Sequence, residues 1–492
     1  MSNCACPFDS IHEECGVFGI WTPPGSSLSP AHETYAALFA LQHRGQEACG
    51  IAVNHRGVIR CHRDVGLVGE VFSQERLASM NGEMAIGHVR YSTTGDPRRE
   101  NAQPLAISHV KGNLAVAHNG NLVNAGALRR KLELGGAVFR ASSDTEVLVY
   151  TLVQERLKAG SIEEAVVRTM GVIQGAYSLC VMSSRKLIAA RDPRGMRPLC
   201  MGTLGDAVVF ASESCALDAL GAKFLRDVEP GEVVVVDHTG AVRSLHVPPA
   251  EKSAVCVFEY IYFARPDSVI DGASVELARQ EAGKYLSLEH PVGADMVMGV
   301  PDSGIPAAIG YARCSGIPYG VGLIKNRYIG RTFIQPAQSD RERSVRLKLN
   351  ALREAVQGKR VIMVDDSIVR GTTCARLIKL VRDAGATEVH LRISAPPFRY
   401  PCFFGTDIPD QEQLLAHDRT VEEMRQIIGA DSLGFLSVDA VRKIARNCRL
   451  GFCDACFTGE YPMEVPAQTD KNIFESEIET LSLIHISEPP RL

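Results

Sequence analysis

Residues 361–373, VIMVDDSIVRGTT, place two adjacent carboxylates and a loop of small hydroxylated residues directly after a short apolar run. The apolar run, 361–364, predicts a strand buried on both faces of a parallel sheet. Asp365 and Asp366 follow at its carboxyl end, where open α/β sheets bind their ligands. The loop from Ser367 to Thr373 offers backbone N–H groups and hydroxyls to a phosphate, and the helix expected after it favours an anion. The segment therefore predicts a site for a phosphorylated ribose, with a buried strand ending in a solvated acidic turn as the alternative.

Composition limits the classes of protein that this chain can belong to. At 492 residues, with 45% hydrophobic and 22% charged residues, it is long enough for two or three globular domains. A net charge of -4 argues against general nucleic-acid binding. Apolar runs stay short of a membrane span, and the amino terminus lacks the features of a secretory signal. Fifteen cysteines, many within apolar runs, are typical of a reducing compartment, so we expect a cytoplasmic protein.

The pattern of apolar runs changes near residue 250. Before that point, many short strand-like runs with few helical patterns predict stacked sheets flanked by helices. One helical pattern, 145–157, is opened by Ser143 and Asp144, which are expected to cap the helix. Residues 247–253, VPPAEKS, read as a linker, and strand-like and helix-like segments alternate after it as βαβ units. The last dozen residues match no periodicity nearby and are set aside as a non-native scar.

Several motifs of the first half occur together in one order. They are EECGVFG around Cys15, QHRGQ (42–46), HVRYSTTG (88–95), HNGN (118–121), SSDTE (142–146) and RDPRG (191–195). Together they resemble the glutamine amidotransferases with an amino-terminal nucleophile, over about residues 15–245. The resemblance implies an αββα sandwich.

The resemblance also implies roles for five residues. Cys15 attacks the glutamine amide and forms a thioester, while Asn119 and the Gly120 N–H stabilise the oxyanion. Arg90 binds the substrate carboxylate and Asp144 its ammonium group. Simpler interpretations are a core cysteine, a surface ion pair for Arg90 and a helix cap for Asp144. Because the α-amine of a terminal cysteine can act as the base for its thiol, we expect residues 1–14 to be a propeptide cut before Cys15.

The opening motif resembles the phosphoribosyl pyrophosphate (PRPP) loop of type I phosphoribosyltransferases, which implies a doubly wound parallel sheet. VPDSG (300–304) matches the loop of this class that faces pyrophosphate. Ser303, Asp365 and Asp366 are then expected near Mg²⁺. The expected substrate-binding residues are Lys325, Tyr328, Ser367, Arg370, Gly371, Thr372 and Thr373. Lys325 and Tyr328 begin a basic tract reaching about residue 350, which is either a solvated face or a mobile lid over pyrophosphate.

The combination resembles the amidophosphoribosyltransferases. It implies a propeptide at 1–14, a glutaminase domain at 15–250, a transferase domain at 251–470 and a tail at 471–492, expected to be disordered and partly non-native. The implied reaction converts glutamine and PRPP into 5-phosphoribosylamine, pyrophosphate and glutamate, the first committed step of purine biosynthesis. Family resemblance also suggests feedback by AMP or GMP and a homotetramer. The alternatives are a non-catalytic PRPP-binding regulator and a phosphoribosyltransferase that acts on a free base.

Some members of this family carry a [4Fe–4S] cluster on four cysteines. The matching positions are Cys256, Cys402, Cys453 and Cys456, and four thiolates are what such a cluster requires. Cys448 complicates the assignment, because with Cys453 and Cys456 it imitates the spacing of plant-type ferredoxins. We therefore keep Cys448 as an alternative ligand.

Overall fold

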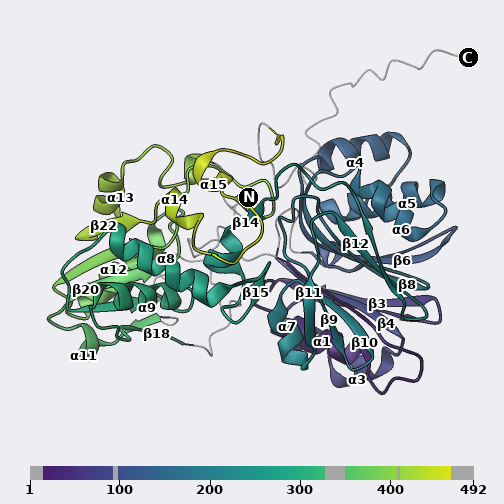
Figure 1. Cartoon of the computed structure of the whole chain (residues 1–492), viewed down its shortest axis with the longest axis horizontal. Helices are drawn as coiled ribbons and strands as arrows, with labels where there is room; N and C mark the ends of the chain where they lie inside the picture. The colour runs from purple at the N-terminus through teal and green to yellow at the C-terminus, as the bar shows by residue number, and fades with distance from the viewer. Residues whose placement is uncertain (1–14, 92–97, 327–348, 407–410, 467–492) are drawn as a thin grey trace, which may run out of the picture.

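The computed structural model describes residues 15–91, 98–326, 349–406 and 411–466. Two lobes lie side by side, the amino-terminal one built on two large sheets and the carboxy-terminal one on a smaller parallel sheet (Figure 1). In the described part of the chain, no helix combines the length and apolar character needed to cross a bilayer. The two lobes confirm the predicted combination of an αββα sandwich and a doubly wound α/β sheet.

The two sheets of the first lobe are antiparallel and stacked. One sheet has seven strands in the order β11-β9-β10-β1-β4-β2-β3. These strands are β1 (Gly16–Trp21), β2 (Ala48–His55), β3 (Val58–Val65), β4 (Met84–Arg90), β9 (Cys200–Leu204), β10 (Ala207–Ala211) and β11 (Lys223–Asp227). The other sheet has six strands in the order β13-β12-β8-β7-β6-β5. These are β5 (Leu105–His109), β6 (Gly112–Leu122), β7 (Gly175–Ser183), β8 (Lys186–Arg191), β12 (Glu232–Asp237) and β13 (Val242–His246).

Helices cover the outer face of each sheet (Figure 1). Those on the first sheet are α1 (Pro30–Ala40), α2 (Val68–Val71), α3 (Gln74–Ser79) and α7 (Ser214–Leu220). Those on the second are α4 (Ala125–Leu134), α5 (Asp144–Lys158) and α6 (Ile162–Met170), and a short turn, η1, spans Arg99–Asn101. Strand β1 shows why the layers form: Val17 and Trp21 pack into the core between the sheets, whereas Phe18 and Ile20 pack under the helices. Successive side chains of a strand point to opposite faces, so a fully apolar strand needs both cores.

The second lobe is centred on a parallel sheet in the order β17-β20-β21-β22. Its strands are β17 (Met296–Gly299), β20 (Arg360–Asp365), β21 (Glu388–Ile393) and β22 (Ser432–Phe435). Its principal helices are α8 (Val275–Glu289), α9 (Gly304–Ser315), α12 (Thr372–Asp383) and α13 (Val421–Ile428). Two segments flank β17 in parallel: β20 on one side and, on the other, the segment at Tyr319, which bridges Val297. The chain therefore passes first to one side of β17 and later to its other side. The β17–β20 junction is therefore a topological switch point, where such sheets bind ligands.

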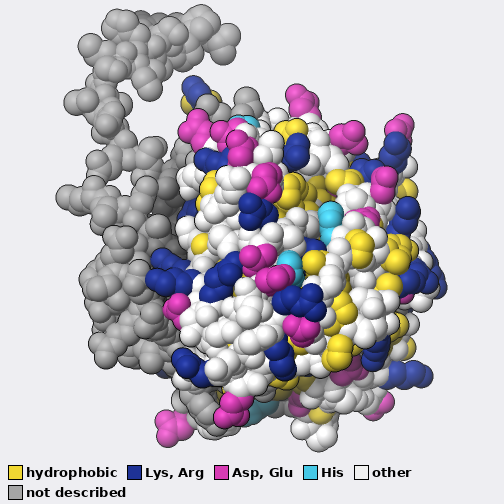
Figure 2. Space-filling model, turned by 90° about the vertical axis from the view of Figure 1, so that its left-hand side faces the viewer, with side chains coloured by type: hydrophobic (Ala, Val, Ile, Leu, Met, Phe, Trp, Pro, Cys, Tyr) yellow, Lys and Arg dark blue, Asp and Glu magenta, His cyan; other side chains and the backbone are white. Residues whose placement is uncertain are grey.

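Short elements complete this lobe and join it to the first. They are β14 (Val255–Cys256), the π-helix η2 (Glu259–Phe263), β15 (Val269–Ile270), β16 (Ala273–Ser274), β18 (Leu323–Lys325), β19 (Leu349–Ala351), α11 (Arg353–Val356), η3 (Gln411–Gln413), α14 (Val438–Val441), β23 (Phe452–Cys453) and α15 (Ala455–Thr458). β14 and β15 lie at the junction of the lobes (Figure 1). On the end face of the second lobe, charged side chains of both signs are interspersed (Figure 2), in keeping with the small net charge.

Candidate active sites

Cys15 lies immediately before β1, and its thiol is buried with 6% of the residue exposed. Its Sγ donates to the Tyr91 carbonyl oxygen at 3.4 Å. Burial raises the pKa of the Cys15 thiol to about 11, against the opposing effects of the Tyr91 hydrogen bond and the Arg90 charge. A thiol in this state needs a base before it can act as a nucleophile.

Two of the predicted substrate-binding residues lie next to this thiol. Arg90 ends β4, whose Val89 pairs with Gly16 in the neighbouring strand. Asp144 begins α5, accepts the Leu122 N–H at 2.9 Å and contributes to the raised pKa of Cys15. A cation and an anion thus face one thiol, as binding of a zwitterionic amino acid requires.

The cap predicted for helix α5 is only partly right. Ser143 is the N-cap residue by backbone conformation, but its side chain makes no capping hydrogen bond. Its hydroxyl is among the buried polar atoms without a partner in the described residues. Asp144 instead uses its carboxylate to fix the end of β6, which ties the helix to the strand that carries Asn119.

Asn119 and Gly120 lie on β6, in the sheet that faces β1. Both polar side-chain atoms of Asn119 are buried without a hydrogen-bond partner among the described residues. Such groups cost about 1–3 kcal/mol each, so an oxygen of a bound ligand would recover that free energy. Gly120 has φ of 139°, and a Cβ there would stand 2.0 Å from the Ala176 carbonyl oxygen. Only glycine fits this position, because any side chain would collide with the neighbouring strand.

The second site lies at the switch point between β17 and β20. Ser303 donates to Asp366 Oδ1 at 2.5 Å, and Ser367 donates to Asp366 Oδ2 at 2.5 Å. Burial raises the pKa values of Asp365 and Asp366, and for Asp365 the neighbouring carboxylate adds to the rise. Two adjacent buried carboxylates repel one another, and a divalent cation relieves that repulsion. Mg²⁺ is usually held by one or two carboxylates together with substrate phosphates.

The loop after Asp366 leads into helix α12. Gly371 has φ of 84°, and a Cβ there would lie 2.7 Å from Leu415 Cδ2. Thr372 and Thr373 form the first turn of α12, whose amino terminus favours an anion. Arg370 donates to Gln413 at 2.7 Å, and Lys325 pairs with Asp302 at 2.6 Å beside Ser303. Tyr328 and most of the basic tract lie outside the described residues.

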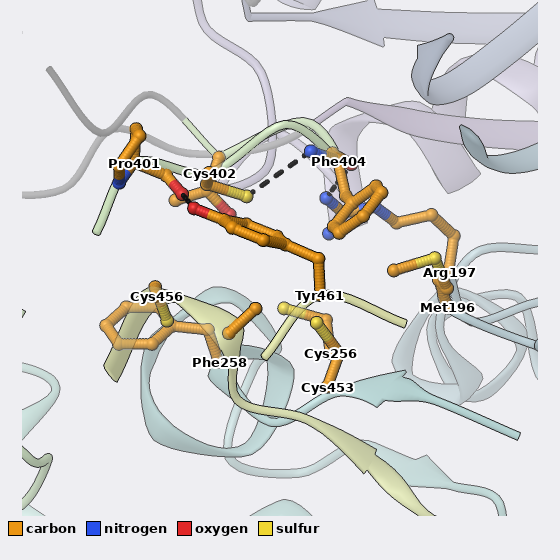
Figure 3. Close-up of a pocket in the computed structure, with 12 residues that line it drawn as sticks. Met196, Arg197, Cys256, Phe258, Pro401, Cys402, Phe404, Cys453, Cys456 and Tyr461 are labelled. Atoms are coloured by element: carbon orange, nitrogen blue, oxygen red, sulfur yellow. Dashed lines mark hydrogen bonds between the residues drawn. The ribbon is translucent and has the colours of Figure 1, made fainter. Parts of the chain in front are cut away.

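Four cysteines line one pocket at the junction of the lobes (Figure 3). Cys256 of β14 pairs with Cys453 of β23 in a parallel ladder, and Cys402 and Cys456 complete the set. Tyr461 reaches between Cys402 and the other three, and its hydroxyl donates to the Pro401 carbonyl at 2.8 Å. Cys448 lines a different cavity, beside Arg442 and Tyr285.

Burial raises the pKa values of Cys256 and Cys453 to about 12 each, and the neighbouring thiols add to the effect. In the described part of the chain, no three His, Cys, Asp or Glu side chains converge as ligands of one metal ion. A [4Fe–4S] cluster has a different requirement, because each thiolate binds a different iron. The donor set of this pocket fits such a cluster.

The motifs QHRGQ and RDPRG each contain an arginine, Arg44 and Arg191, for which the sequence alone predicts no role. Arg44 and Arg191 are completely buried and form bidentate pairs with Glu259 and Asp271 of the second lobe. Glu259 lies 215 positions from Arg44 in the sequence, and Asp271 lies 80 positions from Arg191. Pairs at such separations leave no local pattern by which the sequence could reveal them.

Comparisons with known proteins agree with this arrangement. A family model described as a glutamine amidotransferase domain matches residues 88–219, and one described as a phosphoribosyl transferase domain matches residues 276–396. The chain is 52% identical over 458 residues to amidophosphoribosyltransferase of Archaeoglobus fulgidus, covering 92% of this chain and 99% of that protein. It is 50% identical over 466 residues to amidophosphoribosyltransferase of Bacillus subtilis, covering 93% of this chain and 96% of the relative.

A solved structure, the glutamine phosphoribosylpyrophosphate (PRPP) amidotransferase from B. subtilis complexed with ADP and GMP, is similar over the whole fold. Its TM-score is 0.86 at 49% identity, covering 94% of this chain and all of that one. Both domains are thus matched along one chain, in the same order. The chain therefore belongs to the amidophosphoribosyltransferase family.

Proposed function

We propose that Cys15, once residues 1–14 are removed, hydrolyses glutamine in the first lobe and supplies ammonia to PRPP in the second. The freed α-amine of Cys15 takes the thiol proton, and the sulfur attacks the glutamine side-chain carbonyl to form a thioester. Arg90 binds the substrate carboxylate and Asp144 its ammonium group, while Asn119 and the Gly120 N–H bind the oxyanion. Water then hydrolyses the thioester to glutamate. The observation that carries this proposal is the buried Cys15 thiol facing Arg90 and Asp144.

In the second lobe, the loop from Ser367 to Thr373 would hold the ribose phosphate of PRPP at the amino terminus of α12. Asp365 and Asp366, with Ser303 as a weaker donor, would hold Mg²⁺, which offsets the charge of the departing pyrophosphate. Lys325 pairs with Asp302, the residue before Ser303, and we propose that its ammonium group would bind the pyrophosphate of PRPP. Ammonia attacks carbon 1 of the ribose as pyrophosphate leaves, giving 5-phosphoribosylamine.

Processing and pH test the proposed base. In a chain that keeps residues 1–14, the nitrogen of Cys15 is part of a peptide bond and cannot act as a base. Alkylation of Cys15 by iodoacetamide should then accelerate about tenfold per pH unit toward pH 11. In a chain beginning at Cys15, PRPP-dependent glutamate formation should appear and level off above the amine pKa of about 8. Full glutaminase activity in the unprocessed chain would contradict the proposal. Mass spectrometry confirms the amino terminus in each sample.

Replacing Asn119 with leucine should separate stability from activity. The change removes two buried, unpartnered polar atoms and should raise the thermal denaturation midpoint. It also removes an oxyanion donor, so glutamine-dependent turnover should fall about 10²- to 10³-fold while ammonia-dependent turnover is retained. A less stable variant with unchanged glutamine turnover would show that Asn119 is only a structural residue.

We propose in addition that the four-cysteine pocket binds a [4Fe–4S] cluster with a structural role. Bound there, the cluster would join three segments of the chain, around Cys256, Cys402 and the Cys453–Cys456 turn. Four thiols lining one pocket support this, because four thiolates are the ligand set of such a cluster. Tyr461 lines the same pocket, between Cys402 and the other three cysteines.

Iron and acid-labile sulfide analysis tests the ligand set. Cys256→Ala should lose both elements and the visible absorbance of the cluster after anaerobic purification. Cys448→Ala is the matched control, since Cys448 lies in the other cavity, and it should retain them. Loss of iron in the Cys448 variant alone would assign that cysteine as the ligand instead.

The relatives suggest three further properties. One solved relative is described as complexed with ADP and GMP, and we propose that purine nucleotides inhibit this enzyme as well. We also propose a homotetramer, from the family resemblance, and a cytoplasmic location, from the cysteine content. The free thiols of all cysteines in the described residues support a reducing environment.

A further inference from the structure

Two arginines from the first lobe reach across the domain boundary in the same way. Arg44 donates to both oxygens of Glu259, at 2.9 and 2.8 Å. Arg191 donates to both oxygens of Asp271, at 2.7 and 2.8 Å. Both guanidinium groups are fully buried, so each pair joins the lobes by a charge contact that water does not screen.

The two arginines differ in what their third nitrogen contacts. Arg44 Nε donates to the main-chain carbonyl oxygen of Cys15 at 3.0 Å, whereas Arg191 Nε donates to the carbonyl oxygen of Arg197 at 2.7 Å. One guanidinium therefore connects the backbone of the proposed nucleophile to a carboxylate of the transferase lobe. The other connects the lobes through Asp271, donates to main-chain carbonyls of Gly195, Arg197 and Val228, and does not contact Cys15.

Glu213 makes the Arg44 contact still more constrained. Its carboxylate accepts from Arg44 at 2.6 Å and from His43 at 2.8 Å, and on the other side from Ser268 of the transferase lobe at 2.7 Å. Burial alone would raise the pKa of Glu213, but His43 and Arg44 outweigh it and hold the carboxyl ionised. Arg44 thus has a fixed acceptor on each side, and its orientation depends on both lobes being docked.

Glu259 itself is anchored beside the cysteine pocket. It lies three residues after Cys256 and begins the π-helix η2. Arg197, which lines the cysteine pocket, approaches Glu259 Oε1 at 3.5 Å. The residue that holds Arg44 is therefore part of the same structural unit as the four thiols.

We propose that Arg44 is a positioning residue for Cys15, and that Glu259 of the transferase lobe holds it in place. The proposal rests on Cys15 acting as the terminal nucleophile. Because the base and the thiol then belong to one residue, the orientation of the Cys15 backbone decides whether they can exchange a proton. A guanidinium fixed on the Cys15 carbonyl sets that orientation. Glutamine cleavage consequently depends on the docking of η2 and not only on residues of the glutaminase lobe.

The experiment compares two matched carboxylate substitutions in the processed, full-length chain. Glu259→Gln should lower kcat for glutamine roughly 10- to 100-fold, the scale expected from a small misplacement of a reacting group, with little change in KM. Turnover with ammonia, which bypasses Cys15, should be retained. The pH profile of Cys15 alkylation should also move toward that of the unprocessed chain. Arg44→Lys should share these effects, because lysine keeps the charge but not the forked geometry.

Asp271→Asn is the control, because it breaks the same type of buried interdomain pair without touching Cys15. It should reduce thermal stability while leaving the ratio of glutamine-dependent to ammonia-dependent turnover unchanged. If Glu259→Gln leaves the ratio of glutamine-dependent to ammonia-dependent turnover unchanged, the proposal is overturned and the Arg44–Glu259 pair has only a structural role. If the parent chain itself cleaves no glutamine, the assignment of Cys15 fails first, and that outcome is distinct.

Discussion

Replacing Cys15 with alanine is expected to abolish glutamine-dependent synthesis of 5-phosphoribosylamine, with a loss of roughly 10⁴-fold or more. The thioester cannot form without the sulfur of Cys15. Synthesis from added ammonia should continue, because Asp365, Asp366 and the PRPP loop lie in the other lobe. The measurement is pyrophosphate release from PRPP with glutamine or with ammonium chloride as the nitrogen source.

Cys61→Ala is a suitable control for this variant. Burial raises the pKa of the Cys61 thiol to about 11, and its Sγ donates to the Pro104 carbonyl at 3.4 Å, as Cys15 does to Tyr91. The two thiols therefore share a raised pKa and a main-chain acceptor but not the neighbouring Arg90 and Asp144. Loss of glutamine turnover in both variants would point to a general effect of thiol removal and would argue against Cys15 as the nucleophile.

Asp366→Asn is expected to reduce turnover with glutamine and with ammonia together, by about 10²- to 10³-fold, because a metal site at a leaving group is worth several kcal/mol. Asp366 is the acceptor of both Ser303 and Ser367, so the amide also disturbs the hydroxyls around it. Steady-state kinetics over a Mg²⁺ titration should show a weaker dependence on the metal. PRPP binding measured by calorimetry should weaken in parallel.

The control for this prediction is Asp295→Asn, at the opposite end of the same sheet. Asp295 precedes β17 and pairs with Arg360 on the surface at 2.9 Å, an exposed contact that contributes little to stability. Its loss should leave both activities close to those of the parent. An Asp366 variant that retains ammonia-dependent turnover would show that this acid does not hold the metal.

The local sequence was sufficient to predict the strand that carries the paired acids and the helix that follows it. The run 361–364 predicts a buried strand, and β20 extends it by one residue on either side, to Arg360–Asp365. Helix α12 begins at Thr372, within the last two residues of the loop predicted to bind phosphate. These predictions succeed because a two-sided buried strand, a left-handed glycine and an amphipathic helix each leave a short-range signature.

The local sequence could not predict contacts between segments that lie far apart along the chain. Nothing near Arg44 in the sequence indicates that its partner is Glu259, and Ser143, at the predicted cap of α5, makes no capping hydrogen bond with its side chain. The choice of Cys402 over Cys448 as the fourth member of the cysteine pocket likewise depends on where two loops lie. Spacing along the chain is informative only when the contact is local.

The amino-acid sequence by itself determined which chemical groups this enzyme has: a thiol after a segment predicted to be a propeptide, paired acids after a buried strand, and four cysteines that match a predicted cluster site. The tertiary structure decided how these groups are connected. It places the Cys15 carbonyl, Arg44 and Glu259 in one chain of contacts across two lobes. The physical reason is that propensity and periodicity act over a few residues, whereas a buried charge must find its counterion wherever the packing of the whole chain brings one.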